Sequence, residues 1–261
     1  MKPILSENYF LSAGESNAEQ QMSLPLLISK LIDIATLHAN KLGIGNPAMK
    51  ELKAGWVLAR LTVEMMEYPN VNEDYSISTW IENFNKYFST RCFDIKNNEG
   101  KILGYARSVW MVMDTVNHTN VGLSHFHPAE NMILGESVPI PPQAKHVATI
   151  CEDDKDFDPK TCLKATQSPV DYKFTYCDLD AYRHVNTVRY VSLLLNQYSL
   201  KEHDEFFIKR IELAFLHEAK YGMDVSLYRA DDPGSPVSTF SLINKENGNP
   251  LMFAKLFRQE R

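Results

Sequence analysis

The 261-residue sequence has few cysteines, no long apolar run and no excess of basic charge. Its four cysteines are scattered without a C-x-x-C pair, which argues against a disulfide framework or a zinc knot and favours reduced thiols. No stretch approaches the roughly 20 apolar residues that a membrane span needs. The formal net charge of −6 argues against general nucleic-acid binding. The first residues also lack the apolar core of a signal peptide, so we expect a cytoplasmic protein.

Apolar residues are plentiful even though long apolar runs are missing. The chain is 44% hydrophobic and 11% aromatic, which is ample for a large core. A length of 261 residues suits one large domain or two small ones.

The first half of the chain predicts one helix followed by strands. Residues 23–42 are apolar on most sides, with Ser23 as a helix cap and Pro25 in the first turn, so we expect a buried helix. Strand-like runs rich in aromatic and β-branched residues follow at 56–66, 75–81, 89–96 and 102–114.

The same order of elements then repeats after a proline-rich segment. Residues 135–169 carry five prolines and an acidic cluster, and we interpret them as a connection across the surface. A strand at 170–175, a helix at 184–200 and strands at 207–217, 224–229, 236–244 and 251–258 are predicted beyond it.

Two strand sequences can be laid on each other. "LGYARSVW", beginning at Leu103, aligns with "LMFAKLFR", beginning at Leu251. One helix and an antiparallel sheet used twice predict an α+β protein of two similar halves. We place the first half at 1–135, a linker at 136–169 and the second half at 170–261.

Titratable groups are concentrated in "DLDAYRHVN", just before the second helix. Asp178, Asp180 and His184 stand there against an apolar element, which is costly unless they are paired or used. Either aspartate could instead cap the helix, and His184 could be a satisfied structural histidine.

"DLDAYRHVNTVRYV" resembles the Asp-Leu-Asp-x-Asn-x-His-Val-Asn-Asn-x-x-Tyr signature of acyl-[acyl carrier protein] thioesterases, the plant plastid enzymes and their bacterial relatives. "WVLARLTVEM", "YPNVNEDYSISTW" and "ARSVWMVMD" resemble strands of that family's first half. The resemblance implies a double hotdog fold, in which two long buried helices are each wrapped by an antiparallel sheet.

The resemblance also implies site residues. The family's catalytic aspartate, histidine and glutamate fall on Asp180, His184 and Glu218, although Glu218 could be an ordinary edge-strand carboxylate. The family's asparagine falls on Tyr182, which departs from the signature and makes this tyrosine a candidate substrate-binding residue. The family's cysteine falls on Ala219, which excludes a thiol nucleophile at that position.

The remaining candidates would bind substrate. Asn186 either contacts substrate or ties the loop to the helix. The first half lacks an Asp-x-x-x-His before its helix, so we assign it the acyl-chain pocket. Trp56 and Trp80 would line this pocket or pack in the core.

We therefore expect a hydrolase that converts fatty acyl-acyl carrier protein to a free fatty acid, without a metal or other cofactor. An acyl-CoA thioesterase and a non-catalytic acyl-binding protein are the alternatives, and a homodimer is compatible with the fold. The carrier is acidic, so an acidic chain needs a local basic patch, for which Lys173, Arg183 and Arg189 are candidates. His125 and His127 are a less favoured metal site.

Overall fold

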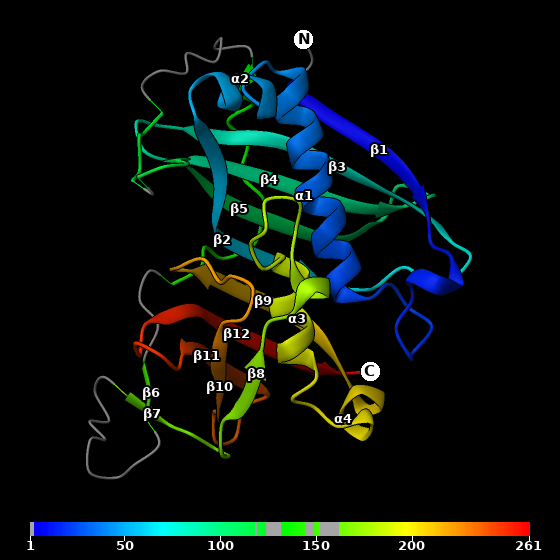
Figure 1. The fold of residues 1–261 in the computed structure, drawn as a ribbon. Coiled ribbons are helices and arrows are strands. Elements are labelled where there is room, and N and C mark those ends of the chain that lie inside the picture. The colour runs from blue at the N-terminus through cyan, green and yellow to red at the C-terminus, as the bar shows by residue number, and fades with distance from the viewer. Residues whose placement is uncertain (1–2, 118, 124–131, 145–148, 152–161) are drawn as a thin grey trace. The chain divides into compact units, whose positions relative to one another are not determined.

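The computed structural model describes residues 3–117, 119–123, 132–144, 149–151 and 162–261. The chain divides into two compact units, 1–141 and 142–261 (Figure 1).

The first unit contains a five-stranded antiparallel sheet in the order β1-β3-β4-β5-β2. Its strands are β1 (Ile4–Phe10), β2 (Ala54–Met65), β3 (Asp74–Phe84), β4 (Ser89–Asn97) and β5 (Ile102–Asp114). Four of them are the predicted strands. β1 was missed because "ILSENYF" does not alternate apolar and polar residues, and none of its residues is buried.

Helix α1 (Leu24–Lys41) begins where Ser23 and Pro25 predict it. The Leu26 N–H donates to Ser23 Oγ at 3.4 Å. Leu27, Leu31 and other residues of one face are buried, whereas Asp33 is exposed, so α1 is buried along one face and not all round. A short helix, α2 (Asn46–Glu51), follows.

The segment after residue 131 packs onto the first unit. Trp80 Nε1 donates to the Glu136 carbonyl at 2.7 Å, and Trp80 packs with Val138. The neighbouring residue Thr79 faces α1, because Arg91 bonds both Thr79 and His38 of α1. Since side chains alternate along a strand, Trp80 lies on the face away from α1. Residues 136–141, expected in the linker, thus belong to the first compact unit.

The second unit repeats this sheet with the strands in equivalent places, in the order β8-β10-β11-β12-β9. They are β8 (Val170–Lys173), β9 (Phe206–Phe215), β10 (Asp224–Asp231), β11 (Val237–Asn244) and β12 (Pro250–Glu260). The Leu103 carbonyl accepts from Met66 N at 2.8 Å, and the Leu251 carbonyl accepts from Leu216 N at 2.9 Å. The two aligned leucines therefore occupy the same place, and the predicted internal repeat is confirmed.

A parallel strand pair, β6 (Thr149–Cys151) and β7 (Cys162–Lys164), precedes this sheet and was not predicted. The acidic cluster at 152–156 lies outside the described residues.

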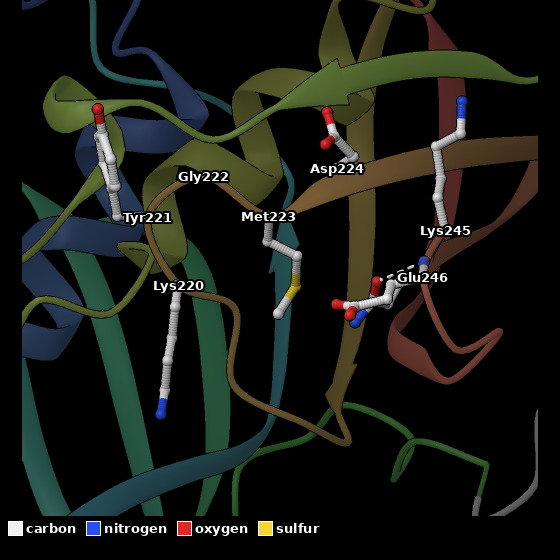
Figure 2. Close-up of a pocket in the computed structure, with 8 residues that line it drawn as sticks. Lys220, Tyr221, Gly222, Met223, Asp224, Lys245 and Glu246 are labelled. Carbon is white, nitrogen blue, oxygen red and sulfur yellow. Dashed lines mark hydrogen bonds between the residues drawn. The ribbon is translucent and has the colours of Figure 1, made fainter.

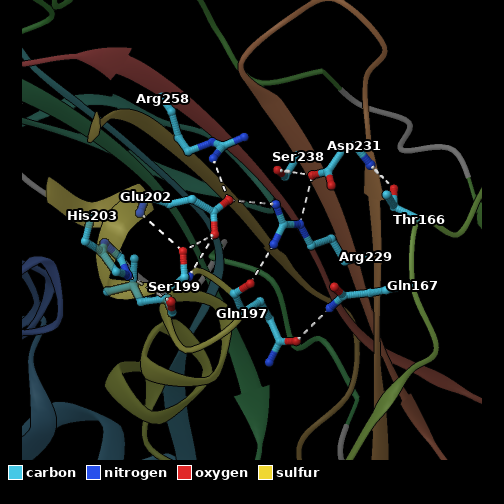
Figure 3. A network of polar contacts seen from close by, with 11 residues as sticks. Thr166, Gln167, Gln197, Ser199, Glu202, His203, Arg229, Asp231, Ser238 and Arg258 are labelled. Carbon is cyan, nitrogen blue, oxygen red and sulfur yellow. Dashed lines mark hydrogen bonds and ion pairs between the residues drawn. The ribbon is translucent and has the colours of Figure 1, made fainter. Parts of the chain in front are cut away.

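The second helix is shorter than predicted: α3 runs over Thr187–Leu195, and a separate α4 covers Leu200–Glu205. A network of polar contacts stabilises the segment between α3 and α4 (Figure 3). Arg229 Nη1 donates to the Gln197 carbonyl at 2.6 Å. The guanidinium groups of Arg229 and Arg258 lie 4.3 and 4.7 Å from the Tyr198 ring centroid, and Glu202 pairs with both. Apolar periodicity could not reveal this stop, because it depends on partners distant in the sequence.

Candidate active site

Asp178 braces the loop that leads into α3. It is buried at the end of a short 3₁₀ turn (Tyr176–Asp178), where Oδ2 accepts from Thr175 N at 2.7 Å and from Thr175 Oγ1 at 3.0 Å. The Tyr172 hydroxyl donates to the same carboxylate at 3.1 Å. All these partners are structural, as predicted for an aspartate that caps or braces.

Asp180 shapes the tight turn that follows. Its Oδ1 accepts from Tyr182 N at 2.8 Å and from His184 N at 3.1 Å, and its own N–H donates to the His184 carbonyl at 2.8 Å. Arg183 adopts a left-handed backbone conformation with φ of 65°. The turn thereby holds the carboxylate of Asp180 against the backbone of His184.

His184 and Glu218 form an acid–histidine pair. His184 Nε2 lies 3.3 Å from Glu218 Oε2, and the two side chains are 33% and 34% exposed. The backbone fixes this approach, because Val185 N donates to the Ala219 carbonyl at 2.9 Å and His184 bridges Lys220 in antiparallel register. The structure therefore brings all three predicted catalytic residues to one loop system that water can reach.

Asn186 and Tyr182 take different positions around this system. Asn186 is the N-cap of α3, and its Oδ1 accepts from Val188 N at 3.1 Å, so it ties the loop to the helix. The side chain of Tyr182 is exposed.

The two predicted tryptophans both lie in the first unit. Trp56 Nε1 donates to the Ile44 carbonyl at 2.7 Å, and Trp56 packs against a buried cluster of which Ala39, near the end of α1, is a member. Trp80 is covered by the segment that carries Val138, on the other face of the sheet.

The first unit contains a copy of the same turn. Asn17 Oδ1 accepts from Gln21 N at 2.8 Å, and Asn17 N donates to the Gln21 carbonyl at 2.8 Å, as Asp180 does with His184. Gln20 has a left-handed φ of 58°, matching Arg183.

The segment opposite the turn matches as well. Met22 N donates to the Pro69 carbonyl at 2.8 Å, as Val185 N does to Ala219, and Gln21 bridges Asn70 as His184 bridges Lys220. These contacts equate Asn17 with Asp180, Gln21 with His184 and Tyr68 with Glu218. The first-unit copy therefore keeps the backbone and lacks the acid–histidine pair. In the sequence, "NAEQQMSLP", beginning at Asn17, stands where the second half has its Asp-x-x-x-His, and the helix caps Ser23 and Asn186 align the two turns.

An open pocket of about 670 Å³ lies in the second unit (Figure 2). Segment 220–224 and the turn between β11 and β12 line it: Lys220, Tyr221, Gly222, Met223, Asp224, Asn244, Lys245 and Glu246. Lys220, which lines this pocket, is also the bridge partner of His184.

Comparison with known proteins decides the family. The acyl-ACP thioesterase N-terminal domain matches residues 3–121, and the C-terminal domain matches residues 163–255. The chain belongs to the acyl-ACP thioesterase family. The residues that the resemblance equates with catalytic positions, Asp180, His184 and Glu218, are brought together by the turn and by the loop after β9. Glu218 therefore lies in a loop and not on the edge strand considered from the sequence.

Curated relatives include a chloroplastic palmitoyl-acyl carrier protein thioesterase of Gossypium hirsutum, 25% identical over 82% of this chain and 52% of that protein. Another is oleoyl-acyl carrier protein thioesterase 1 of Arabidopsis thaliana, 22% identical over 82% of this chain and 60% of that protein. The chain thus spans little more than half the length of these curated relatives.

Solved structures match over nearly the whole chain. An acyl-ACP thioesterase from Bacteroides thetaiotaomicron has a TM-score of 0.85 at 24% identity, covering 98% of both chains. The 12:0-ACP thioesterase from Umbellularia californica has a TM-score of 0.83 at 15% identity, covering 100% of this chain and 99% of that one. These likenesses establish the double hotdog fold.

Two further observations concern metals and membranes. Among the described residues, no three His, Cys, Asp or Glu side chains gather closely enough to hold a metal ion. His125 and His127 lie outside the described residues. In the part of the chain that the structure describes, every helix is too short or too polar to cross a membrane.

Proposed function

We propose that the protein hydrolyses the thioester of fatty acyl-acyl carrier protein, releasing a free fatty acid and the carrier thiol. The observation that supports this proposal is the His184–Glu218 pair at 3.3 Å, held beside Asp180 in the turn that carries the family signature.

The chemistry needs a group that removes a proton from water and a group that protonates the leaving sulfur. Water adds its oxygen to the thioester carbonyl carbon, and the C–S bond breaks as the thiol leaves. Glu218 orients His184, whose second ring nitrogen is left to exchange protons with water and sulfur. A carboxylate, Asp180 or Glu218, activates the water.

Asp180 is available for this role because its two oxygens differ. Oδ1 accepts two backbone N–H groups, whereas Oδ2 makes no hydrogen bond to another described residue. One oxygen therefore holds the turn, and the other is left to act on substrate.

We propose that the acyl chain lies in the first unit, on the α1 side of its sheet. Trp56 packs near the end of α1 and is placed to bound such a pocket. Trp80 faces the other way and would serve the core.

The test is thiol release from one acyl group presented on carrier protein and on CoA, followed with a thiol dye. Faster turnover on the carrier supports the proposal. Faster turnover on CoA would make the protein an acyl-CoA thioesterase, and no release from either would leave a non-catalytic acyl-binding protein.

A further inference from the structure

Two cations lie directly beside the acid–histidine pair. Lys220 is the bridge partner of His184, and Arg183 precedes His184 in the turn. Both side chains are exposed, and neither forms an ion pair with a described carboxylate. Lys173, another candidate from the sequence, lies 3.4 Å from Asp224 and is already paired. Arg183 and Lys220 therefore each carry exposed positive charge next to His184, and Arg189, the third candidate from the sequence, is exposed on α3.

Each cation is next to an exposed tyrosine. Tyr182 and Tyr221 are both 69% exposed, which leaves large aromatic surfaces uncovered. We call these four residues, Tyr182, Arg183, Lys220 and Tyr221, the cationic rim. Figure 2 shows Lys220 and Tyr221 pointing to opposite sides of their loop.

The first-unit copy shows that the backbone does not require these side chains. The equivalents of the rim there are Glu19, Gln20, Asn70 and Val71. The rim has a formal charge of +2, from one Arg and one Lys, whereas its counterpart has −1, from one Glu. The same turn is built in both units, so charge and aromatic surface accompany only the copy that has the acid–histidine pair.

We infer that the cationic rim is the docking surface for the acidic face of the protein carrier that delivers the thioester. This inference rests on the proposed function. A chain with a net charge of −6 repels an acidic partner at long range, so recognition needs local positive charge at the site. Exposed tyrosines supply the contact area that a small protein interface needs.

The test variant takes its residues from the first-unit copy: Arg183→Gln, as in Gln20, with Lys220→Asn, as in Asn70. Both replacements already occur on this backbone, so the fold should be kept, and thermal unfolding checks it. The control is Lys201→Gln with Lys209→Gln, which removes the same charge elsewhere in the second unit. Lys201 pairs with Glu205, and Lys209 bonds Gln259 near the far end of β9 from Glu218.

Each variant is assayed with one acyl group on carrier protein, on CoA and on N-acetylcysteamine, which carries neither protein nor phosphate. We expect kcat/KM on the carrier to fall roughly tenfold in the rim variant, with less salt dependence than before. The two smaller substrates and the control variant should change less than about twofold.

A matching loss on carrier and CoA would instead assign the cations to the shared phosphopantetheine phosphate and overturn the inference. An equal loss in the control, or no loss, would overturn it as well. Carrier binding by the unmodified protein and the rim variant is also measured directly, at low salt and at about 0.5 M salt. If no thioester were hydrolysed, the proposed function would fail. The docking inference would then be tested by binding alone: carrier binding that is weakened in the rim variant would support it, and carrier binding that is unchanged in the rim variant would contradict it.

Discussion

Asn17 and Asp180 do the same structural work in the two halves of the chain. Each side chain accepts the N–H of the residue four positions on, at 2.8 Å from Gln21 and at 3.1 Å from His184. Since an amide oxygen suffices for this turn in the first unit, a negative charge at residue 180 is not needed for folding. This separates the structural role of Asp180 from the catalytic role proposed for it.

Replacing His184 with Gln should remove catalysis and keep the turn, because Gln21 occupies the equivalent position. Glu218→Gln should also lower turnover, because it removes the carboxylate that pairs with His184. Each change should lower kcat by about 10²–10⁴, the usual cost of losing an acid–base group. Single-turnover thiol release measures the chemical step, and a loss confined to KM would contradict the assignment.

Asp178 should matter for stability more than for turnover. Asp178→Asn should cost about 1 kcal/mol, as for a weakened cap. Asp178→Ala should cost about 2 kcal/mol, because it leaves Thr175 N and the Tyr172 hydroxyl without their acceptor. Urea unfolding gives these values. If Asp178→Asn abolished turnover at unchanged stability, Asp178 and Asp180 would have to exchange roles.

Substitutions of Trp56 and Trp80 should have different effects, because we place Trp56 beside the acyl-chain pocket and Trp80 in the core. Trp56→Leu should shift the chain length of the fatty acids released, because it opens space beside α1. Trp80→Leu should lower stability by about 1 kcal/mol or more through the lost bond to Glu136, and leave the product profile as it was. Product analysis by chain length checks both, and the reverse pattern would move the acyl chain to the other face of the sheet.

Thioester hydrolysis should not depend on a cysteine side chain. Ala219 occupies the family's cysteine position, and Cys177 is exposed on the loop before the turn. Burial and the neighbouring Glu82 raise the pKa of Cys92 to about 12, so its thiol stays protonated near neutral pH. Cys177→Ser and Cys92→Ala should therefore keep most of the turnover in the thiol-release assay. A loss above about a hundredfold in Cys177→Ser would revive a thiol mechanism.

The sequence was most informative where local chemistry decides structure. Ser23 and Pro25 predicted the start of α1, and the aligned leucines Leu103 and Leu251 predicted the repeat. The end of α3 was missed, because Arg229 and Glu202 fix it from other elements. Lys220 was missed for a similar reason: only the bridge to His184 brings it to the site, and no local pattern marks it.

The burial of Trp80 beneath residues 136–141 was likewise beyond the sequence. A proline-rich segment resembles a linker by composition. Whether it packs onto the sheet depends on the side chains that the sheet exposes to it. Trp80 and Arg107 offer both an apolar surface and donors, with Arg107 Nη1 reaching the Ile140 carbonyl at 3.4 Å.

Asp180→Asn tests the central claim most directly, because it gives the catalytic turn the residue that the first-unit copy already has. The account predicts a thermal midpoint close to that of the unmodified protein, retained binding of acyl substrate, and a fall in kcat of about a hundredfold or more. Near-full turnover in Asp180→Asn would contradict the account, since the charge at residue 180 would then serve only the turn.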